Sequence, residues 1–146
     1  MDDKGRLIDT SAVDGIIGYR LRRAQLAVFG RFMQRFAEAD LKPAEYSVLV
    51  LIADNPGLRP SDVAAALDIK RANFVALSNG LVRRNLIERR RPPGDRRAHA
   101  LALTAAGQSL VARLREIQRG FEDELIGRLG GPAERDRLLT LLARLG

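Results

Sequence analysis

The sequence contains no cysteine and no tryptophan, and its single histidine is His99. Without cysteine the chain forms no disulfide, offers no thiolate to a metal ion, and has neither a cysteine nucleophile nor a thiol redox sensor. One histidine alone gives little support for a zinc site. We therefore expect no metal and no cofactor. An enzyme is also disfavoured, because no nucleophile accompanies a histidine base.

Long apolar runs and glycine-rich phosphate loops are also missing. The longest apolar run, residues 48–53, is far shorter than the roughly 20 residues that cross a bilayer. Residues 1–9 alternate charges and lack the apolar stretch of a signal peptide. The glycines of residues 127–131 are not followed by Lys-Ser or Lys-Thr, as a P-loop requires. These features predict a cytoplasmic protein without a membrane partner.

The composition predicts one ordinary globular domain. Hydrophobic residues make up 46% and charged residues 29% of the 146 positions, and aromatic residues only 5%. The core must therefore depend on Leu, Val, Ile and Ala.

Positive charge is concentrated in one segment. The net charge is +7, and 22 arginines against three lysines are also what a GC-rich genome would encode. Residues 83–97, however, contain seven arginines against Glu88 and Asp95, a net charge of +5. This local excess favours an anion-binding surface over a general compositional bias.

Apolar periodicity and turn residues predict the order of elements. Ser11 and Asp14 resemble an N-cap and its acidic partner, which predicts a long helix from there to about Glu38. Pro43 suits the start of a second helix, which ends before the Asn-Pro-Gly of residues 55–57. Further helices are expected over residues 61–67, 71–84, 104–129 and 133–145, and strands over 86–91 and 98–103.

The fold class is therefore mainly α with a small β-wing. Four helices, two strands and two helices in this order are typical of a winged helix-turn-helix. Within a single structural domain we expect an N-terminal dimerisation region (residues 1–40), a DNA-binding lobe (41–104) and C-terminal dimerisation helices (105–146).

The predicted helix over residues 71–84 suits the major groove of DNA. Phe74, Leu77 and Leu81 form its inward face. The opposite face and its start carry Lys70, Arg71, Asn73, Ala76, Asn79 and Arg83. Asn and Arg pair bidentately with adenine and guanine, and Ala76 allows close approach or contact with a thymine methyl. Ser61, near the start of the preceding helix, is a candidate phosphate contact. The alternative is a solvated polar face.

The predicted hairpin is rich in arginine. Arg89, Arg90, Arg91, Arg96 and Arg97 surround its turn. Arginines of this kind enter the minor groove, and Asp95 would orient a neighbouring guanidinium. The alternative is a solvated arginine-rich loop.

The helix end of residues 81–89 is followed by Asp95-x-Arg97, then by five residues, and then by Leu103-Thr104-x-x-Gly107. With this motif, residues 41–107 resemble the MarR family of bacterial transcription regulators. The resemblance implies that helix 71–84 enters the major groove, that Arg96 and Arg97 reach the minor groove, and that Asp95 orients the wing. The chain departs from the family's usual pattern at six positions. Lys42 and Arg59 stand where hydroxyl caps are common, and Asp68 and Asn85 replace frequent glycines. Ala76 and Gly80 replace frequent polar or basic residues on helix 71–84.

The terminal helices predict a homodimer. Their apolar faces lack a partner within one small domain, and pairing them across a two-fold axis would bury Ile8, Val13, Ile16, Leu125, Leu138 and Leu142. Two copies of helix 71–84 would then read an inverted repeat in double-stranded DNA. An intramolecular bundle is the alternative.

The resemblance also implies repression that is relieved by a small aromatic carboxylate or its coenzyme A thioester. The candidate residues for binding this effector are Tyr19, Arg20, Arg23, Phe29, Phe32 and Tyr46. Rings would stack on the ligand and an arginine would hold its anionic end. Each aromatic residue has the alternative role of plain core packing.

Two other binding functions are alternatives. An architectural or silencing-antagonist protein without a ligand would share every DNA-contact feature. An RNA-binding winged helix would need an exposed aromatic platform, which this sequence lacks.

Overall fold

A computed structural model describes residues 7–91, 93–94 and 99–146. In chain order the elements are α1 (Ser11–Asp14), α2 (Ile17–Arg35), a 3-10 turn (Ala37–Ala39), α3 (Pro43–Asp54), α4 (Pro60–Ala66), α5 (Arg71–Arg83), β1 (Ile87–Arg90), β2 (Ala100–Leu103), α6 (Ala105–Leu129) and α7 (Pro132–Ala143).

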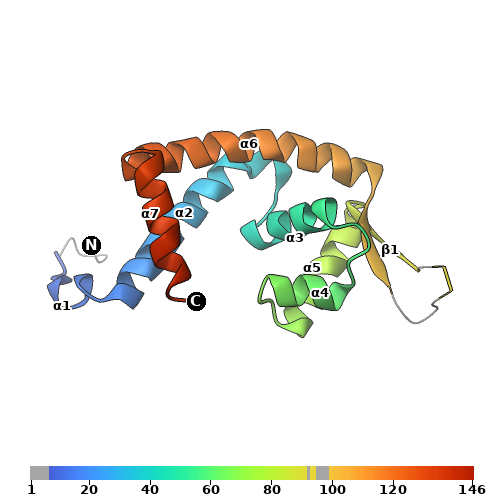
Figure 1. Cartoon of the computed structure of the whole chain (residues 1–146), viewed down its shortest axis with the longest axis horizontal. Coiled ribbons are helices and arrows are strands. Elements are labelled where there is room, and N and C mark those ends of the chain that lie inside the picture. Colours follow the sequence, from blue (N-terminus) through green and yellow to red (C-terminus); the bar gives the residue numbers. More distant parts are fainter. Residues whose placement is uncertain (1–6, 92, 95–98) are drawn as a thin grey trace.

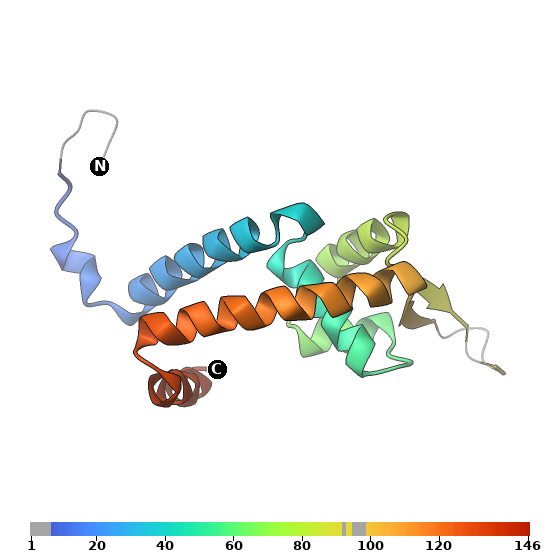
Figure 2. The same ribbon diagram turned by 90° about the horizontal axis from the view of Figure 1, so that it is seen from above.

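The long helix α6 runs along the length of the molecule and connects its two ends (Figure 1). One end of α6 joins the lobe formed by α3, α4, α5 and the two strands, and its other end joins α7. Seen from above, α2 lies alongside α6 (Figure 2). We call α3–α5 with β1 and β2 the winged lobe. No helix within the described ranges has a stretch long and apolar enough to span a bilayer.

The N-terminal region is not the single helix that the sequence predicts. The prediction of one helix from Ser11 to about Glu38 is wrong, because Gly15 and an extended Ile16 separate α1 from α2. Ser11 is not the N-cap either. Thr10 holds that position, and its hydroxyl donates to the Asp14 carboxylate (2.9 Å). Glycine is a poor helix former, and α1 buries no residue that would offset its cost.

The starts of α3 and α4 explain how Lys42 and Arg59 replace the usual hydroxyl caps. Both helices begin with a proline at their first position, as the sequence predicts. The backbone N–H of Lys42 donates to the Glu45 carboxylate (2.9 Å), and that of Arg59 donates to Asp62 (3.2 Å). Each helix start is therefore held by the acidic residue three positions on.

The two strands form an antiparallel hairpin that is shorter than predicted. Ile87 pairs with Leu103, and Arg90 pairs with Ala100. The backbone N–H of Leu101 donates to the carbonyl oxygen of Leu58 (2.8 Å), which connects the hairpin to the segment between α3 and α4. The hairpin is thus fixed to the winged lobe at its base.

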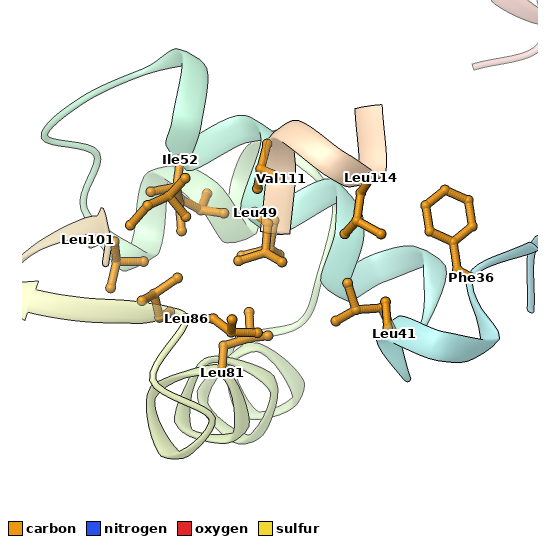
Figure 3. Packing of buried hydrophobic residues seen from close by; sticks show 14 of the residues in the cluster. Phe36, Leu41, Leu49, Ile52, Leu81, Leu86, Leu101, Val111 and Leu114 are labelled. Atoms are coloured by element: carbon orange, nitrogen blue, oxygen red, sulfur yellow. The ribbon is translucent and has the colours of Figure 1, made fainter. Parts of the chain in front are cut away.

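The core lies where α3, α5, the hairpin and α6 meet (Figure 3). Leu49, Leu81, Leu101 and Leu114 are fully buried there, one from each of these elements. Phe36, which follows α2, extends the cluster along α6. The poses of α5 and of the hairpin are therefore set by the same packing that holds α6.

Candidate nucleic-acid interface

Helix α5 is held by one apolar face. Phe74 and Leu81 are buried and Leu77 is partly buried, as the period predicts. Ser78 is buried as well, and its hydroxyl donates to the carbonyl oxygen of Val75 (3.1 Å), so no polar group is left unpaired on this face. The opposite face is consequently available to a partner.

Most of the predicted DNA contacts lie on that opposite face. At the N-cap and on the outer surface of α5 the exposed ones are Lys70, Arg71, Asn73, Ala76 and Arg83, and Ser61 is exposed near the start of α4. Lys70 is the N-cap of α5 and makes no side-chain capping bond. The first N–H groups of the helix and two basic side chains therefore share one end of α5. This is an arrangement that attracts anions.

Asn79 differs from the other five contacts predicted on α5. It is half-buried, and its amide oxygen accepts a hydrogen bond from the Arg89 guanidinium of β1. Arg90 is paired with Glu88 (2.5 Å), while Arg91 is exposed. Part of the basic charge at the wing thus serves to attach the wing to α5. Asp95, Arg96 and Arg97 lie outside the described residues, so their roles remain predictions.

The C-terminal end of α5 is anchored to two different elements. Arg84 donates to the carbonyl oxygens of Ala39 (2.7 Å) and Asp40 (2.8 Å), in the turn after α2. Asn85 adopts the predicted left-handed conformation (φ 57°), and its carbonyl oxygen accepts from the Thr104 hydroxyl (2.6 Å). Sequence reasoning missed Arg84, since nothing in the sequence distinguishes it from Arg83. These hydrogen bonds fix the C-terminal end of α5 to the turn after α2 and to the start of α6.

Two of the predicted effector residues belong to an aromatic cluster. Phe32 is 5% exposed and stacks on Phe36 with ring centroids 4.1 Å apart. Tyr46 and Phe121 lie 6.0 and 6.2 Å from Phe32. Burial raises the pKa of the Tyr46 phenol, which stays neutral and can donate a hydrogen bond. Phe32 is therefore a core residue in one protomer.

The six predicted effector residues do not form one pocket within a single chain. Tyr19 is half-buried, and Arg20, Arg23 and Phe29 are exposed along α2. Thirteen helical positions separate Tyr19 from Phe32, about 20 Å along the axis. An open groove of about 620 Å³ lies elsewhere, between the end of α3, strand β2 and the first half of α6. None of the six residues lines it.

Many exposed apolar side chains lie on the terminal helices and on the segments next to α1. The predicted dimer residues Ile8, Ile16, Leu138 and Leu142 are exposed, at 60, 53, 38 and 38%. Val13 is half-exposed, and Leu125 packs partly against the core. Further exposed members of this surface are Leu7, Ile17, Leu21, Leu26, Phe29, Met33, Leu129, Leu139, Leu141 and Leu145. We call all these side chains except Leu125 the apolar terminal surface.

This fold and arrangement match known regulators. The model of the MarR family matches residues 39–98. The putative transcriptional regulatory protein for the hcr operon of Thauera aromatica is 36% identical over 132 residues, which are 90% of this chain and 79% of that relative.

Solved structures agree along nearly the whole chain. The transcriptional repressor CouR bound to a 23-mer DNA duplex has a TM-score of 0.88 and 38% identity, covering 96% of this chain and 99% of CouR. CouR bound to p-coumaroyl-CoA gives the same score and identity over 95 and 97% of the two chains. BpsR of Bordetella bronchiseptica, whose DNA binding is regulated by 6-hydroxynicotinic acid, has a TM-score of 0.82 and 27% identity over 96 and 97%.

The extent of these matches, together with the winged lobe and the motif from Leu103 to Gly107, establishes that the chain belongs to the MarR family.

Proposed function

We propose that this protein is a homodimeric cytoplasmic repressor that binds an inverted repeat in duplex DNA and is released by an aromatic carboxylate or its coenzyme A thioester. One observation carries the DNA-binding part. Helix α5 presents Lys70, Arg71, Asn73 and Arg83 on its exposed face, beside the arginine-rich wing. Donors of this kind suit phosphates and purine edges in the major groove.

Dimerisation is supported by the apolar terminal surface. It comprises many exposed apolar side chains from residues 7–33 and 129–145, whereas the surface of an ordinary monomer carries such side chains singly. Burying it against a second copy would stabilise the protein and position two α5 helices on successive turns of DNA. Replacing Leu138 and Leu142 by Glu should therefore give a folded monomer in sedimentation experiments. A dimer that survives both charges contradicts this interface.

Effector binding is supported by the similar regulators that bind an aromatic acid or a thioester. In the dimer, Tyr19, Phe29 and Tyr46 would stack on the ligand, and Arg20 or Arg23 would hold its anionic end. A ligand that binds one spacing of the two winged lobes better than the other shifts the dimer away from the DNA-bound shape. These precedents make the ligand-independent architectural alternative the weaker hypothesis.

The first experiment selects genomic DNA fragments bound by the full chain at physiological salt. An inverted repeat near a promoter is the expected outcome. Arg96→Ala/Arg97→Ala should weaken binding to it severely. Arg119→Ala is the matched control, because Arg119 is exposed on α6, outside the winged lobe, and within the described part of the chain its one ion pair is with Glu116 (2.7 Å). Enrichment without a shared repeat favours the architectural alternative, and no retained DNA contradicts the proposal.

The second experiment adds p-coumaroyl-CoA, or a panel of aromatic carboxylates, to the protein–operator complex. We expect release that depends on effector concentration. Arg20→Ala and Arg23→Ala should raise the concentration needed for half release, while Arg119→Ala should not. A complex that persists at saturating concentrations of every compound argues against this effector class.

A further inference from the structure

An exposed valine stands on the outer face of α5. Val75 is 49% exposed. Among the described residues between Gln34 and Arg128 it is the one exposed large apolar side chain, whereas the others all belong to the apolar terminal surface. Val75 is thus separate from that surface both in sequence and in the fold. Dimerisation through the apolar terminal surface therefore does not explain why an apolar side chain is exposed at this position.

The position of Val75 places it among the predicted base contacts. Residues four apart on a helix are neighbours on one face, so Arg71, Val75 and Asn79 form one row along α5. The neighbouring row begins with Ala72 and Ala76, both exposed. These short side chains allow the backbone of α5 to approach a surface closely, and Val75 is the largest apolar group that would meet it.

Val75 lies outside the hydrophobic core. Val75 is absent from the core cluster and from the apolar residues packed against it. A β-branched residue also lowers helix stability relative to alanine. Neither burial in the core nor local helix formation therefore favours this side chain at this place.

We propose that Val75 is a specificity-determining residue that contacts the C5-methyl group of a thymine in each half of the operator. The thymine methyl is the one apolar group on the major-groove edges of the bases, and small apolar side chains are its usual partners. This inference rests on the proposed function. It adds that the preferred operators carry a thymine at the base pair that faces Val75 in each half-site.

Deoxyuridine tests the contact, because it lacks only the C5-methyl group of thymidine. In the operator recovered by genomic selection, each thymine is replaced in turn and the dissociation constant is measured. One position in each half-site should be sensitive. The expected loss of affinity is about fourfold with one half-site changed and about fifteenfold with both, the value for one buried methyl per contact.

Val75→Ala completes a double-mutant cycle with the same duplexes. The variant should bind the thymine operator more weakly by a similar factor and should no longer distinguish deoxyuridine at the sensitive position. Val75→Thr keeps one methyl group and should retain part of the discrimination. Deoxyuridine at thymines outside the repeat serves as the control. Thermal unfolding should leave both variants folded, with Val75→Ala at or slightly above the wild-type melting temperature, because Val75 is exposed and alanine favours the helix.

The outcomes separate the inference from the proposed function. If the wild type binds a repeat but Val75→Ala and deoxyuridine act additively, or if Val75→Ala has no effect, the thymine contact is wrong and the proposed function stands. If the wild type retains no DNA, both fail together. A loss of affinity that is the same for every duplex, without loss of discrimination, also overturns the contact.

Discussion

The hydroxyl of Thr104 joins the end of α5, at Asn85, to the start of α6. It donates to the carbonyl oxygen of Asn85 (2.6 Å) and accepts from the backbone N–H of Gly107 (3.0 Å). The backbone N–H of Thr104 donates to the carbonyl oxygen of Leu86 (3.1 Å). These hydrogen bonds connect the segment that follows α5 to the start of α6, which extends from this junction to α7.

Removal of the Thr104 hydroxyl should loosen this junction. Thr104→Ala deprives Gly107 of its capping acceptor and Asn85 of its donor, so we expect the free energy of unfolding to fall by about 1–2 kcal/mol. Thr104→Ser keeps both hydrogen bonds and should be close to the wild type. Urea titrations at equal protomer concentration measure the difference, because dimerisation makes stability depend on concentration. Equal stability of the alanine and serine variants would show that the hydroxyl is dispensable.

Gly107 is required for the close approach of α6 to Leu86, the residue before β1. A Cβ at this position would overlap with the carbonyl oxygen of Leu86 and lie 3.0 Å from its carbonyl carbon. Gly107→Ala should therefore destabilise the chain by about 2–4 kcal/mol, since backbone must shift to relieve the overlap. Gly120→Ala, in the same helix, is the control.

The contrast between the two glycines is sharp because a Cβ at Gly120 meets only the Arg35 guanidinium, at 3.7 Å. That contact is ordinary, and alanine favours the helix by about 0.5–1 kcal/mol over glycine. Thermal and urea unfolding of the two variants should thus move in opposite directions. A mild effect at Gly107 would mean that α6 can retreat from Leu86 at little cost.

Much of the fold follows from local signals in the sequence. Pro43 and Pro60 begin helices, Asn85 adopts the left-handed conformation, and Gly130 and Gly131 end α6 with φ of 104° and 127°. The break at Gly15 was not predicted. The apolar period of the N-terminal region continues across it, and a single glycine inside a periodic stretch does not by itself end a helix.

For the candidate site, the sequence predicts which residues lie on the exposed face of α5, but not their contacts with other elements. The exposed residues of α5 follow from its period, but the engagement of Asn79 by Arg89 joins two elements, and no local pattern contains it. The same holds for Phe32, whose neighbours Tyr46 and Phe121 come from α3 and α6. Sequence periodicity assigns a face to a side chain, whereas its partner depends on the packing of separate elements.

The contact between α2 and α6 should make the protein sensitive to acid. Arg35 (2.6 Å), Arg31 (3.3 Å) and Arg128 (3.5 Å) surround the Glu124 carboxylate. The hydrogen bond from Arg35 is the main cause that holds the pKa of Glu124 below its ordinary value of 4.5. Because the folded-state pKa is lowered, this contribution to stability is complete above pH 4.5 and is lost as the pH falls through the folded-state pKa.

Melting temperatures measured between pH 6 and 3 test this interaction. Glu124→Gln should be less stable than the wild type at pH 6, and the difference should shrink as the pH falls through the lowered folded-state pKa of Glu124 and the wild-type carboxylate becomes protonated. Arg35→Gln should behave similarly, and the double variant should lose less than the sum of the two. Parallel pH profiles for the wild type and Glu124→Gln would rule out this source of acid sensitivity.

Arg83 and Arg84 are neighbours in sequence, but their alanine variants should differ both in stability and in the salt dependence of operator binding. Arg84 holds two carbonyl oxygens of the turn after α2, so Arg84→Ala should lower the free energy of unfolding by about 1–2 kcal/mol. Arg83 is exposed and faces the proposed DNA side, so Arg83→Ala should change stability by less than about 0.5 kcal/mol.

In operator binding, unlike in stability, the Arg83 variant should show the larger direct effect of the two. Arg83→Ala removes a cation from each protomer and should reduce the slope of log affinity against log salt by about two per dimer. Arg84→Ala should leave the slope unchanged, since its guanidinium stays with the protein in the bound state, and should weaken binding only through the altered pose of α5. A change of salt slope in the Arg84 variant alone would mean that the two neighbours exchange roles on DNA.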